Sequence, residues 1–399
     1  MEFAPRVLDL FCGAGGMSLG FKQAGCVILG GVESEIYPNK THERNFTSGV
    51  IEPGRKDIRK LKPEDLGLKP GDIDILIGGP PCQGFSVVGQ SKIRSLGLEA
   101  ERDKKNKLYL EFVRFLRYFK PDYFVIENVP GMEYFKQQSF LTNVLTQLKR
   151  AGYVVDKRVL RATDFGVPQL RQRLFIIGRR KDRDDLNLVF PEAVFETPVS
   201  VRDAIGDLRT LHATELVTQK GSLSNGGAKH EDKPVTYRCA PNSNYQRLMR
   251  ANNGDTVSNH ICRGHNRHDL IIFDKLKQGQ RYVDLPAKYR RYRDDIFKDK
   301  YRRLHAGRPA WTLTAHMQRD CLAYIHPTQK RSISAREAAR LQSFPDDFVF
   351  EGPLTKVFHQ IGNAVPPLLA QHVAMGLVSE LERATMESTQ SKEASSVAV

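Results

Sequence analysis

The chain has 399 residues, 40% hydrophobic and 27% charged, which is the composition of a water-soluble globular protein long enough for two domains. No apolar run approaches the roughly 20 residues that cross a bilayer, and the start, MEFAPRVLDLF, has no signal-peptide pattern, so we expect a cytoplasmic protein without a membrane segment. Lys and Arg exceed Asp and Glu by 61 − 46 = 15, and this surplus indicates either a polyanionic partner or simply a basic, solvated surface.

The cysteines are spread along the chain without a Cys-x-x-Cys pair, which argues against a zinc ribbon and a disulfide framework. We therefore expect no metal site and free thiols throughout. Most of these thiols should be small buried groups, but Cys82 follows two prolines and needs a separate explanation.

The first 185 residues alternate strand and helix patterns. Near-continuous apolar runs predict strands, and runs with helical spacing separate them, so this part should be a doubly wound, mostly parallel α/β sheet covered on both faces. The predicted strands are residues 6–11, 27–33, 72–79, 123–129, 154–160 and 173–179, and the predicted helices are 17–25, 108–119 and 139–152.

The rest of the chain divides into three further segments. Residues 186–325 are rich in Asn, His, Arg, Gly and Pro and predict a smaller, irregular second domain. Residues 326–384 should return to the first domain: Ser334 and Glu337 form a capping box, and a long amphipathic helix begins near Pro366. Residues 385–399 are small and polar, which is typical of a disordered tail.

A glycine-rich turn follows the first predicted strand, in DLFCGAGGMSLGF. Gly13, Gly15 and Gly16 allow close approach of the backbone to a ligand at a helix N-terminus. A tight turn alone can explain such glycines. Glu33, however, closes the second strand about 20 residues later, where an acid binds ribose hydroxyls, and together they favour a nucleoside-containing cofactor.

The stretch GGPPCQGFS presents Cys82 at the carboxyl end of a buried strand. Ligands of open α/β sheets bind at this edge, and the rigid Pro80–Pro81 pair preorganises the thiol, so Cys82 is a candidate nucleophile. The next strand ends in Glu127, a candidate proton donor at the same edge. Gln169, Arg171 and Arg173 alternate, so we expect them on one face of the strand that follows.

Six blocks together resemble the C5-cytosine-specific DNA methyltransferases of the bacterial restriction–modification type. These blocks occur in the family's order over residues 6–180 and about 330–384, and the gap falls where the family has its target-recognition domain. They are DLFCGAGGMSLGF, GGPPCQGFS, ENV, PQLRQRLFIIG, SAREAARLQSFPDDF and QIGNAVPPLLA.

The resemblance implies an S-adenosylmethionine-dependent methyltransferase fold and assigns site residues. Cys82 corresponds to the nucleophile, Glu127 to the acid on the cytosine ring, and Arg171 and Arg173 to the flanking arginines. The remaining matched positions would bind S-adenosylmethionine: Phe11, Gly13, Ala14, Gly16, Glu33, Asp57, Ile58, Pro81, Leu108 and Asn363.

The implied reaction is methylation of C5 of a flipped cytosine in a specific double-stranded DNA sequence, through a covalent bond from Cys82 to C6. A monomer and a separate cognate restriction endonuclease would fit this family type. Two alternatives remain: an RNA cytosine-5 methyltransferase of the same superfamily, and a DNA-binding module without activity. The long segment 186–325 favours DNA over RNA, and the complete set of catalytic residues argues against an inactive module.

Overall fold

The computed structural model describes residues 3–46, 49–81, 107–133, 139–213, 233–290 and 300–397, without the side chains of 139 and 391–397. Cys82, the loop that follows it and most of the basic, aromatic segment 288–303 lie outside the described residues. The chain forms two compact units. The first comprises Met1–Phe165, Gln172–Val194 and Val365–Val399, and the second comprises Gly166–Arg171 and Phe195–Ala364.

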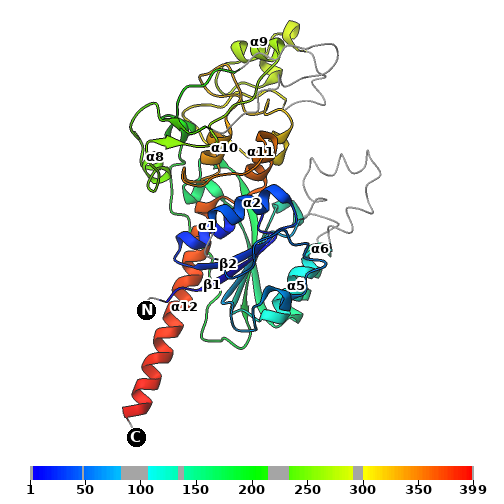
Figure 1. The fold of residues 1–399 in the computed structure, drawn as a ribbon, viewed down its shortest axis with the longest axis vertical. Helices are drawn as coiled ribbons and strands as arrows, with labels where there is room; N and C mark the ends of the chain where they lie inside the picture. Colours follow the sequence, from blue (N-terminus) through cyan, green and yellow to red (C-terminus); the bar gives the residue numbers. More distant parts are fainter. Residues whose placement is uncertain are drawn as a thin grey trace. The chain divides into compact units, whose positions relative to one another are not determined.

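A six-stranded sheet forms the centre of the first unit (Figure 1). All its neighbouring strands are parallel except where β7 pairs with β4 and β5, so the predicted mostly parallel sheet is confirmed. Leu10 pairs with Gly78 and Gly78 with Ile126, which brings the carboxyl ends of three strands to one edge. The spatial order is β2 (Val27–Val32), β1 (Arg6–Leu10), β3 (Ile75–Gly78), β4 (Tyr123–Asn128), β7 (Gln172–Arg180) and β5 (Tyr153–Arg161).

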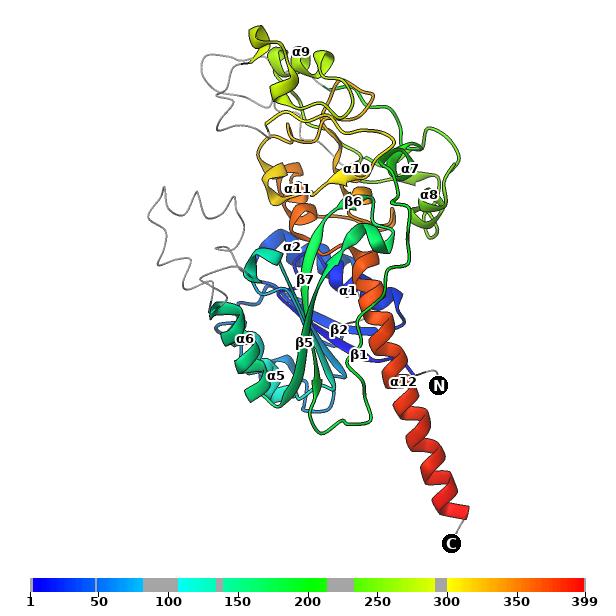
Figure 2. The same cartoon turned by 180° about the vertical axis from the view of Figure 1, so that it is seen from behind.

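Helices cover both faces of this sheet (Figure 2). On one face, α5 (Tyr109–Phe119) and α6 (Ser139–Arg150) bury an apolar stripe against strand residues such as Leu76 and Phe124. On the other, α1 (Gly16–Gln23) packs on α12 (Pro367–Val397), and a Cβ on Gly20 would lie 2.5 Å from Ala370 Cβ. Among the described residues of this unit, the other helices are α2 (Ile36–Asn45), η1 (Pro63–Leu66), η2 (Pro130–Glu133) and η4 (Ala162–Phe165).

Among the described residues, one stretch, Leu354–Gln390, is long and apolar enough to cross a membrane by length and composition alone. However, 72% of its most apolar window is buried inside the protein. Such burial is typical of a helix that packs in a protein core.

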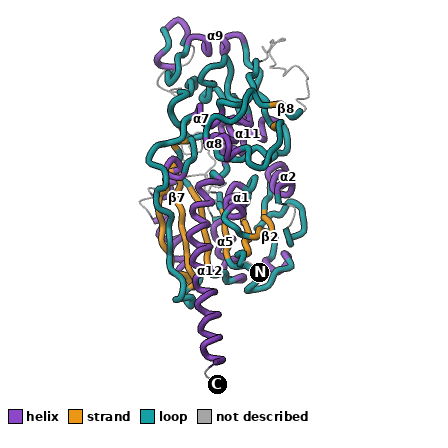
Figure 3. Tube along the Cα trace, turned by 90° about the vertical axis from the view of Figure 1, so that its left-hand side faces the viewer, coloured by secondary structure: helices purple, strands orange, loops and turns teal. Residues whose placement is uncertain are grey.

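The second unit consists mainly of loops between short elements (Figure 3), as the sequence predicts for an irregular domain. Its apolar core includes Phe273, Tyr282 and Tyr301. Its helices are α7 (Val201–Ile205), α8 (Asn244–Met249), α9 (Arg267–Lys275), η5 (Tyr282–Asp284), η6 (Ala287–Tyr289), η7 (Ala315–Gln318), α10 (Ala335–Leu341) and α11 (Leu354–Asn363). Its strands form two short pairs, β6 (Gln169–Leu170) with β10 (Ala310–Trp311), and β8 (Val235–Thr236) with β9 (Thr256–Val257).

Buried ion pairs supplement this small core. The predicted capping box is present, since Glu337 N–H donates to Ser334 Oγ and Ser334 N–H to Glu337. Glu337 also binds the guanidinium of Arg331 at 2.6 Å, and both side chains are almost wholly buried. The equally buried Arg340 joins two carboxylates, those of Asp207 and Asp346. The pair with Asp207 connects α10 to a segment 133 residues away, whereas Arg331 and Asp346 each lie six residues from their partners on α10.

The segment boundaries differ from the predicted ones. Residues 326–364 belong to the second unit, and the chain returns to the first at Val365, because α10 and α11 bury their polar and apolar groups among second-unit residues. The predicted disordered tail from 385 also differs, since α12 continues to Val397. Ala, Glu, Gln and Lys in this stretch have high helix propensity, which extends the helix.

Candidate active site and cofactor turn

The glycine-rich turn joins β1 to α1 at the carboxyl edge of the sheet. Phe11, with φ 59°, takes a left-handed conformation that non-glycine residues rarely adopt, and Gly13 and Gly15 are also left-handed, with φ 54° and 93°. The amide of Gly15 donates to Cys12 O at 2.9 Å and closes the turn. A Cβ at Gly13 would meet nothing within 4 Å, so the space beside this backbone is open, as approach of a ligand requires.

Glu33 lies directly beside this turn. Its Oε2 accepts the Gly13 amide at 3.1 Å, while its Oε1 accepts the amides of Ser34 and Glu35 at 2.6 and 2.7 Å. Burial raises the pKa of Glu33, although these backbone hydrogen bonds oppose the shift. A carboxylate fixed here can accept hydrogen bonds from a pair of ribose hydroxyls, so the residues present fit a nucleoside-containing cofactor.

Of the other predicted cofactor residues of the first unit, Asp57 and Ile58 lie between α2 and η1, and Leu108 directly precedes α5. Asp57 pairs with Arg59 at 2.7 Å, and hydrogen bonding to this guanidinium lowers the pKa of Asp57. Ile58 is buried, and its carbonyl accepts Arg114 Nη2 at 2.8 Å. Leu108, just before α5, and Phe11 both pack against the same apolar core, and Ala14 is buried within the turn.

Glu127, near the end of β4, forms an ion pair with Arg173, near the start of β7. Arg173 Nε lies 2.8 Å from Glu127 Oε1, and the two side chains are only 13% and 11% exposed. Burial lowers the pKa of Arg173, and the neighbouring Glu127 carboxylate opposes this effect. The antiparallel pairing of β4 with β7, Glu127 opposite Phe175, brings the two groups together.

The backbone that leads to Cys82 is held against the same strand end. Asn128 Nδ2 donates to Pro80 O at 3.2 Å, and a Cβ on Gly79 would lie 3.5 Å from Glu127 Oε2. The partly buried Pro81 is the last residue described before Cys82. The structure therefore brings the Glu127 carboxylate next to the Gly-Gly-Pro-Pro stretch, and the position of the Cys82 thiol remains a prediction.

Arg171 does not join the Glu127–Arg173 pair. Its buried guanidinium donates to Leu313 O at 2.8 Å and to Ala364 O at 2.9 Å, all within the second unit. Gln169 is also buried there and donates to Leu341 O at 3.1 Å. Gln169, Arg171 and Arg173 therefore do not share one face of a single strand as expected. Gln169 and Arg171 belong to the second unit and Arg173 to the first, because β6 ends at Leu170 and β7 starts at Gln172.

Asn363 is exposed at the end of α11 in the second unit, where its Nδ2 lies 3.2 Å from His359 Nε2. Its contribution to a cofactor pocket stays a prediction. Among the described residues, no group of three His, Cys, Asp or Glu side chains could hold a metal ion.

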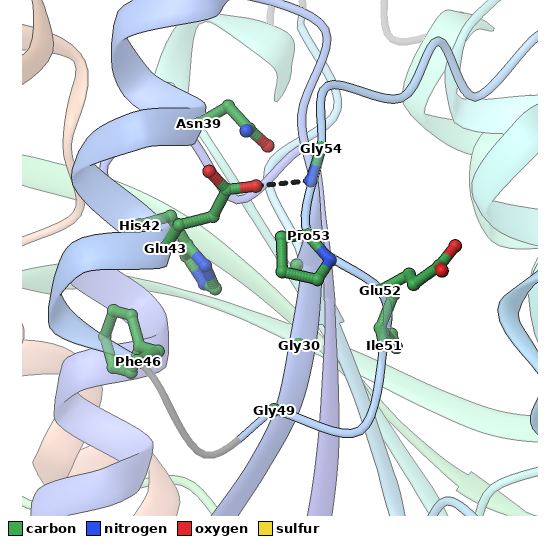
Figure 4. Close-up of a pocket in the computed structure, with 11 residues that line it drawn as sticks. Gly30, Asn39, His42, Glu43, Phe46, Gly49, Ile51, Glu52, Pro53 and Gly54 are labelled. Carbon is green, nitrogen blue, oxygen red and sulfur yellow. Dashed lines mark hydrogen bonds between the residues drawn. The ribbon is translucent and has the colours of Figure 1, made fainter.

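A polar cluster that the sequence did not predict lies beneath the cofactor turn. Asp9 of β1, Ser18 of α1 and His42 of α2 are all buried and joined by hydrogen bonds. His42 and Phe46 also line a cavity of about 220 Å³ beside β2 (Figure 4). The sequence contains one indication of this cluster, the acidic Asp9 among the apolar residues of VLDLF.

An open α/β sheet with a glycine turn after β1 and an acid after β2 defines a nucleoside-cofactor enzyme of the doubly wound class. Within this class the chain belongs to the C-5 cytosine-specific DNA methylase family, whose model matches residues 5–379. It is a DNA (cytosine-5-)-methyltransferase that uses S-adenosylmethionine as methyl donor, so the predicted family, fold class, activity and cofactor are confirmed.

Similar proteins agree with this assignment. The chain is 36% identical to the type II methyltransferase M.DdeI of Desulfomicrobium norvegicum, over 92% of this chain and 87% of the relative. It is 35% identical to M.XorII of Xanthomonas oryzae pv. oryzae, over 95% and 86%. A crystal structure of an E. coli prophage-encoded protein, described as a DNA modification methyltransferase, matches with a TM-score of 0.73 and 27% identity, over 95% of this chain and 100% of that one.

Proposed function

We propose that this methyltransferase is the modification enzyme of a type II restriction–modification system and methylates a flipped cytosine in one specific double-stranded DNA sequence, with Cys82 as nucleophile. The observation that carries the residue assignment is the buried Glu127–Arg173 pair, which lies against Gly79 at the edge of the sheet where the chain continues to Cys82. The type II relatives support the biological setting.

The proposed reaction proceeds in steps, in which Cys82 and Glu127 act directly on the cytosine ring. C5 of cytosine is a poor nucleophile, so the Cys82 thiolate first forms a bond to C6 and pushes electron density toward C5. Glu127, held by Arg173, stabilises N3 and the exocyclic amine as this bond forms. S-adenosylmethionine supplies the electrophilic methyl group. Once C5 carries this methyl group, loss of the C5 proton restores the ring and breaks the bond to Cys82.

Cofactor binding is assigned to the first unit. The amides of the Phe11–Gly16 turn would bind the cofactor, and the Glu33 carboxylate would bind its ribose. Asp57 and Ile58 would contact the adenine of the cofactor. Pro81 and Leu108 would pack nearby. Asn363 would complete this pocket. Arg171 is better explained as a support, because its Nη1 and Nη2 groups already donate to second-unit carbonyls.

Sequence recognition is assigned to the predicted segment 186–325, most of which belongs to the second unit. The duplex hides C5, so the target base must be rotated into the site while other residues read its neighbours. We expect the protein to act as a monomer in the cytoplasm, on nucleoid DNA, alongside a separate cognate endonuclease.

Bisulfite sequencing of DNA from cells that express the chain tests this proposal. We expect complete protection of one cytosine within a single short sequence, and no protection in cells that express Cys82→Ala. Transfer RNA from the same cells should remain unmethylated by the enzyme. Methylated transfer RNA with unmodified DNA, or methylation by Cys82→Ala, would contradict the proposal.

A further inference from the structure

Three side chains from three elements meet beneath the cofactor turn. Ser18 Oγ lies 2.6 Å from Asp9 Oδ2 and 3.1 Å from His42 Nε2, and the three residues are at most 5% exposed. Ser18 is in the first turn of α1, directly after the glycines, whereas Asp9 precedes them in β1. A single hydroxyl therefore connects both sides of the turn to α2.

The turn rests closely on the same α2 residues. A Cβ on Gly15 would lie 3.0 Å from His42 Cδ2 and 2.5 Å from Phe46 Cε2, and the two rings pack with centroids 4.5 Å apart. On the opposite side, a Cβ on Gly31 of β2 would lie 2.8 Å from His42 Nε2. The imidazole is thus clamped between the turn and the sheet, and a shift of the ring would shift Gly15.

The hydrogen-bond directions are linked because Ser18 has one hydroxyl proton. Burial lowers the pKa of His42 to about 4, so the ring is neutral at pH 7 and Nε2 can either donate or accept. Burial also raises the pKa of Asp9 to about 7, opposed by hydrogen bonds from Ser18. With Asp9 ionised, Ser18 donates to Asp9 and accepts from His42; with Asp9 protonated, both directions reverse. Either arrangement keeps the three groups connected.

We propose that Ser18 and His42 are positioning residues for cofactor binding: with Asp9 they hold the Phe11–Gly16 turn in its left-handed conformation. Phe11, Gly13 and Gly15 have strained or glycine-dependent dihedral angles, which persist only where the surroundings fix them. The cluster supplies this constraint from below, while Glu33 binds the Gly13 amide from beside the turn. This inference rests on the proposed binding of the cofactor by the turn.

Calorimetric titration with S-adenosylhomocysteine tests the proposal in the full chain. Ser18→Ala and His42→Phe should each weaken binding of S-adenosylhomocysteine by about five- to thirtyfold, the usual effect of a lost buried hydrogen bond. In steady-state assays the KM for S-adenosylmethionine should rise, whereas kcat at saturation should change less than about twofold. His42→Gln should restore most of the affinity, because its amide can also donate or accept. His42→Phe keeps an aromatic ring against Phe46 and removes the hydrogen bond, and His42→Gln tests whether restoring this hydrogen bond restores binding.

Two further variants make the result decisive. Val144→Ala truncates a buried side chain of α6 and should lower the melting temperature without changing the dissociation constant. Phe11→Ala reports whether the turn binds the cofactor. If Phe11→Ala weakens binding but Ser18→Ala and His42→Phe bind like the wild type, the positioning role is wrong. If Phe11→Ala also binds like the wild type, the turn is not the cofactor site, and the assignment beneath both proposals fails. Should Ser18→Ala not fold, the comparison of His42→Phe with His42→Gln decides alone.

Discussion

Glu127, the proposed acid on the cytosine ring, is held in place by one buried ion pair with Arg173. An ion pair this far from water is strongly destabilised when one partner is removed, since the other charge remains buried. The pair also fixes the direction of the carboxylate, which faces Gly79 rather than bulk solvent. These two properties suit the proposed role of Glu127, which is to contact the cytosine after it has rotated out of the DNA duplex.

Glu127→Gln should lower kcat by roughly two to four orders of magnitude, the usual size of a general-acid effect, and should leave affinity for S-adenosylhomocysteine nearly unchanged. Transfer of a radioactive methyl group to DNA under single-turnover conditions measures this. Glu133→Gln is a matched control, because Glu133 pairs with Lys157 in the same unit but lies outside the proposed chemistry. Wild-type turnover in Glu127→Gln would remove the proposed role.

The two arginines should respond differently to the same substitution. Arg173→Gln removes the partner of Glu127 and should reduce kcat at least tenfold. Arg171→Gln leaves buried carbonyls without donors and should mainly destabilise the protein, by about 3 kcal/mol. Thermal denaturation and single-turnover rates separate the two effects. Equal kinetic losses with equal melting temperatures would show that Arg171 acts at the base as well.

Among the secondary-structure elements, α10 is stabilised by Glu337 in two ways. Its carboxylate accepts the Ser334 amide at the start of the helix and binds the buried Arg331 guanidinium. Burial alone would raise the pKa of Glu337, but Arg331 and its hydrogen bonds hold it well below the ordinary value of 4.5. A carboxylate with a depressed folded-state pKa stabilises the protein above its unfolded pKa, and this stability is lost as the pH falls below 4.5.

Glu337→Gln should therefore lower stability at pH 7 by about 3 kcal/mol or more, because Arg331 stays buried without its anion. Its melting temperature should also change less than that of the wild type between pH 4.5 and 3. Circular dichroism melts at several pH values provide the measurement, with the exposed Glu196→Gln as control. Parallel pH profiles for Glu337→Gln and wild type would show that this pair does not govern acid stability.

Sequence patterns predicted the elements whose burial follows a simple period. β1, β3, β4 and α5 are buried on the faces that their apolar residues indicate, and Ser334 starts α10 as its capping box predicts. In contrast, α2 was missed, because IYPNKTHERN is mostly polar and contains Pro38. Its His42 and Asn39 are nevertheless buried, through tertiary contacts that no local pattern encodes.

Some of the candidate site residues also lie together in the structure, although their roles stay predictions. Glu33 and the glycine turn lie together, and Glu127 lies beside Arg173, because strand ends determine both pairs. Arg171, in contrast, donates to Leu313 O and Gly362 O, which lie 142 and 191 residues away in the sequence. Alternation within a short segment could not predict these partners. The Asp9–Ser18–His42 cluster has the same origin in long-range packing.

At the scale of the whole molecule, the second unit should carry target choice as one exchangeable body. Arg340, outside the predicted segment 186–325, binds Asp207 inside it, and Tyr245 Oη donates to Arg340 O at 2.5 Å. Exchange of residues 166–171 together with 195–364 should therefore give a folded chimera, whereas exchange of 186–325 alone needs compatible partners for both sides of this contact.

Bisulfite sequencing of DNA from cells that express the chimera with 166–171 and 195–364 exchanged should show methylation at the donor's target sequence. Binding to unrelated DNA should stay strongly salt-dependent, since the chain's net charge of +15 supplies sequence-independent phosphate contacts. A chimera that still methylates the parental sequence would place recognition elsewhere in the chain.

Cys82 is proposed to attack C6 of the cytosine ring, and trapping of the resulting bond is the sharpest test of this mechanism. Fluorine at C5 cannot leave as a cation, so DNA with 5-fluorocytosine at the target should remain covalently bound after methyl transfer. With S-adenosylmethionine present, we expect an adduct that survives denaturing electrophoresis and maps by mass spectrometry to the peptide with Cys82, and no adduct with Cys82→Ala. An adduct on Cys82→Ala, or methylation of normal DNA by a wild-type enzyme that never forms the adduct, would contradict the account.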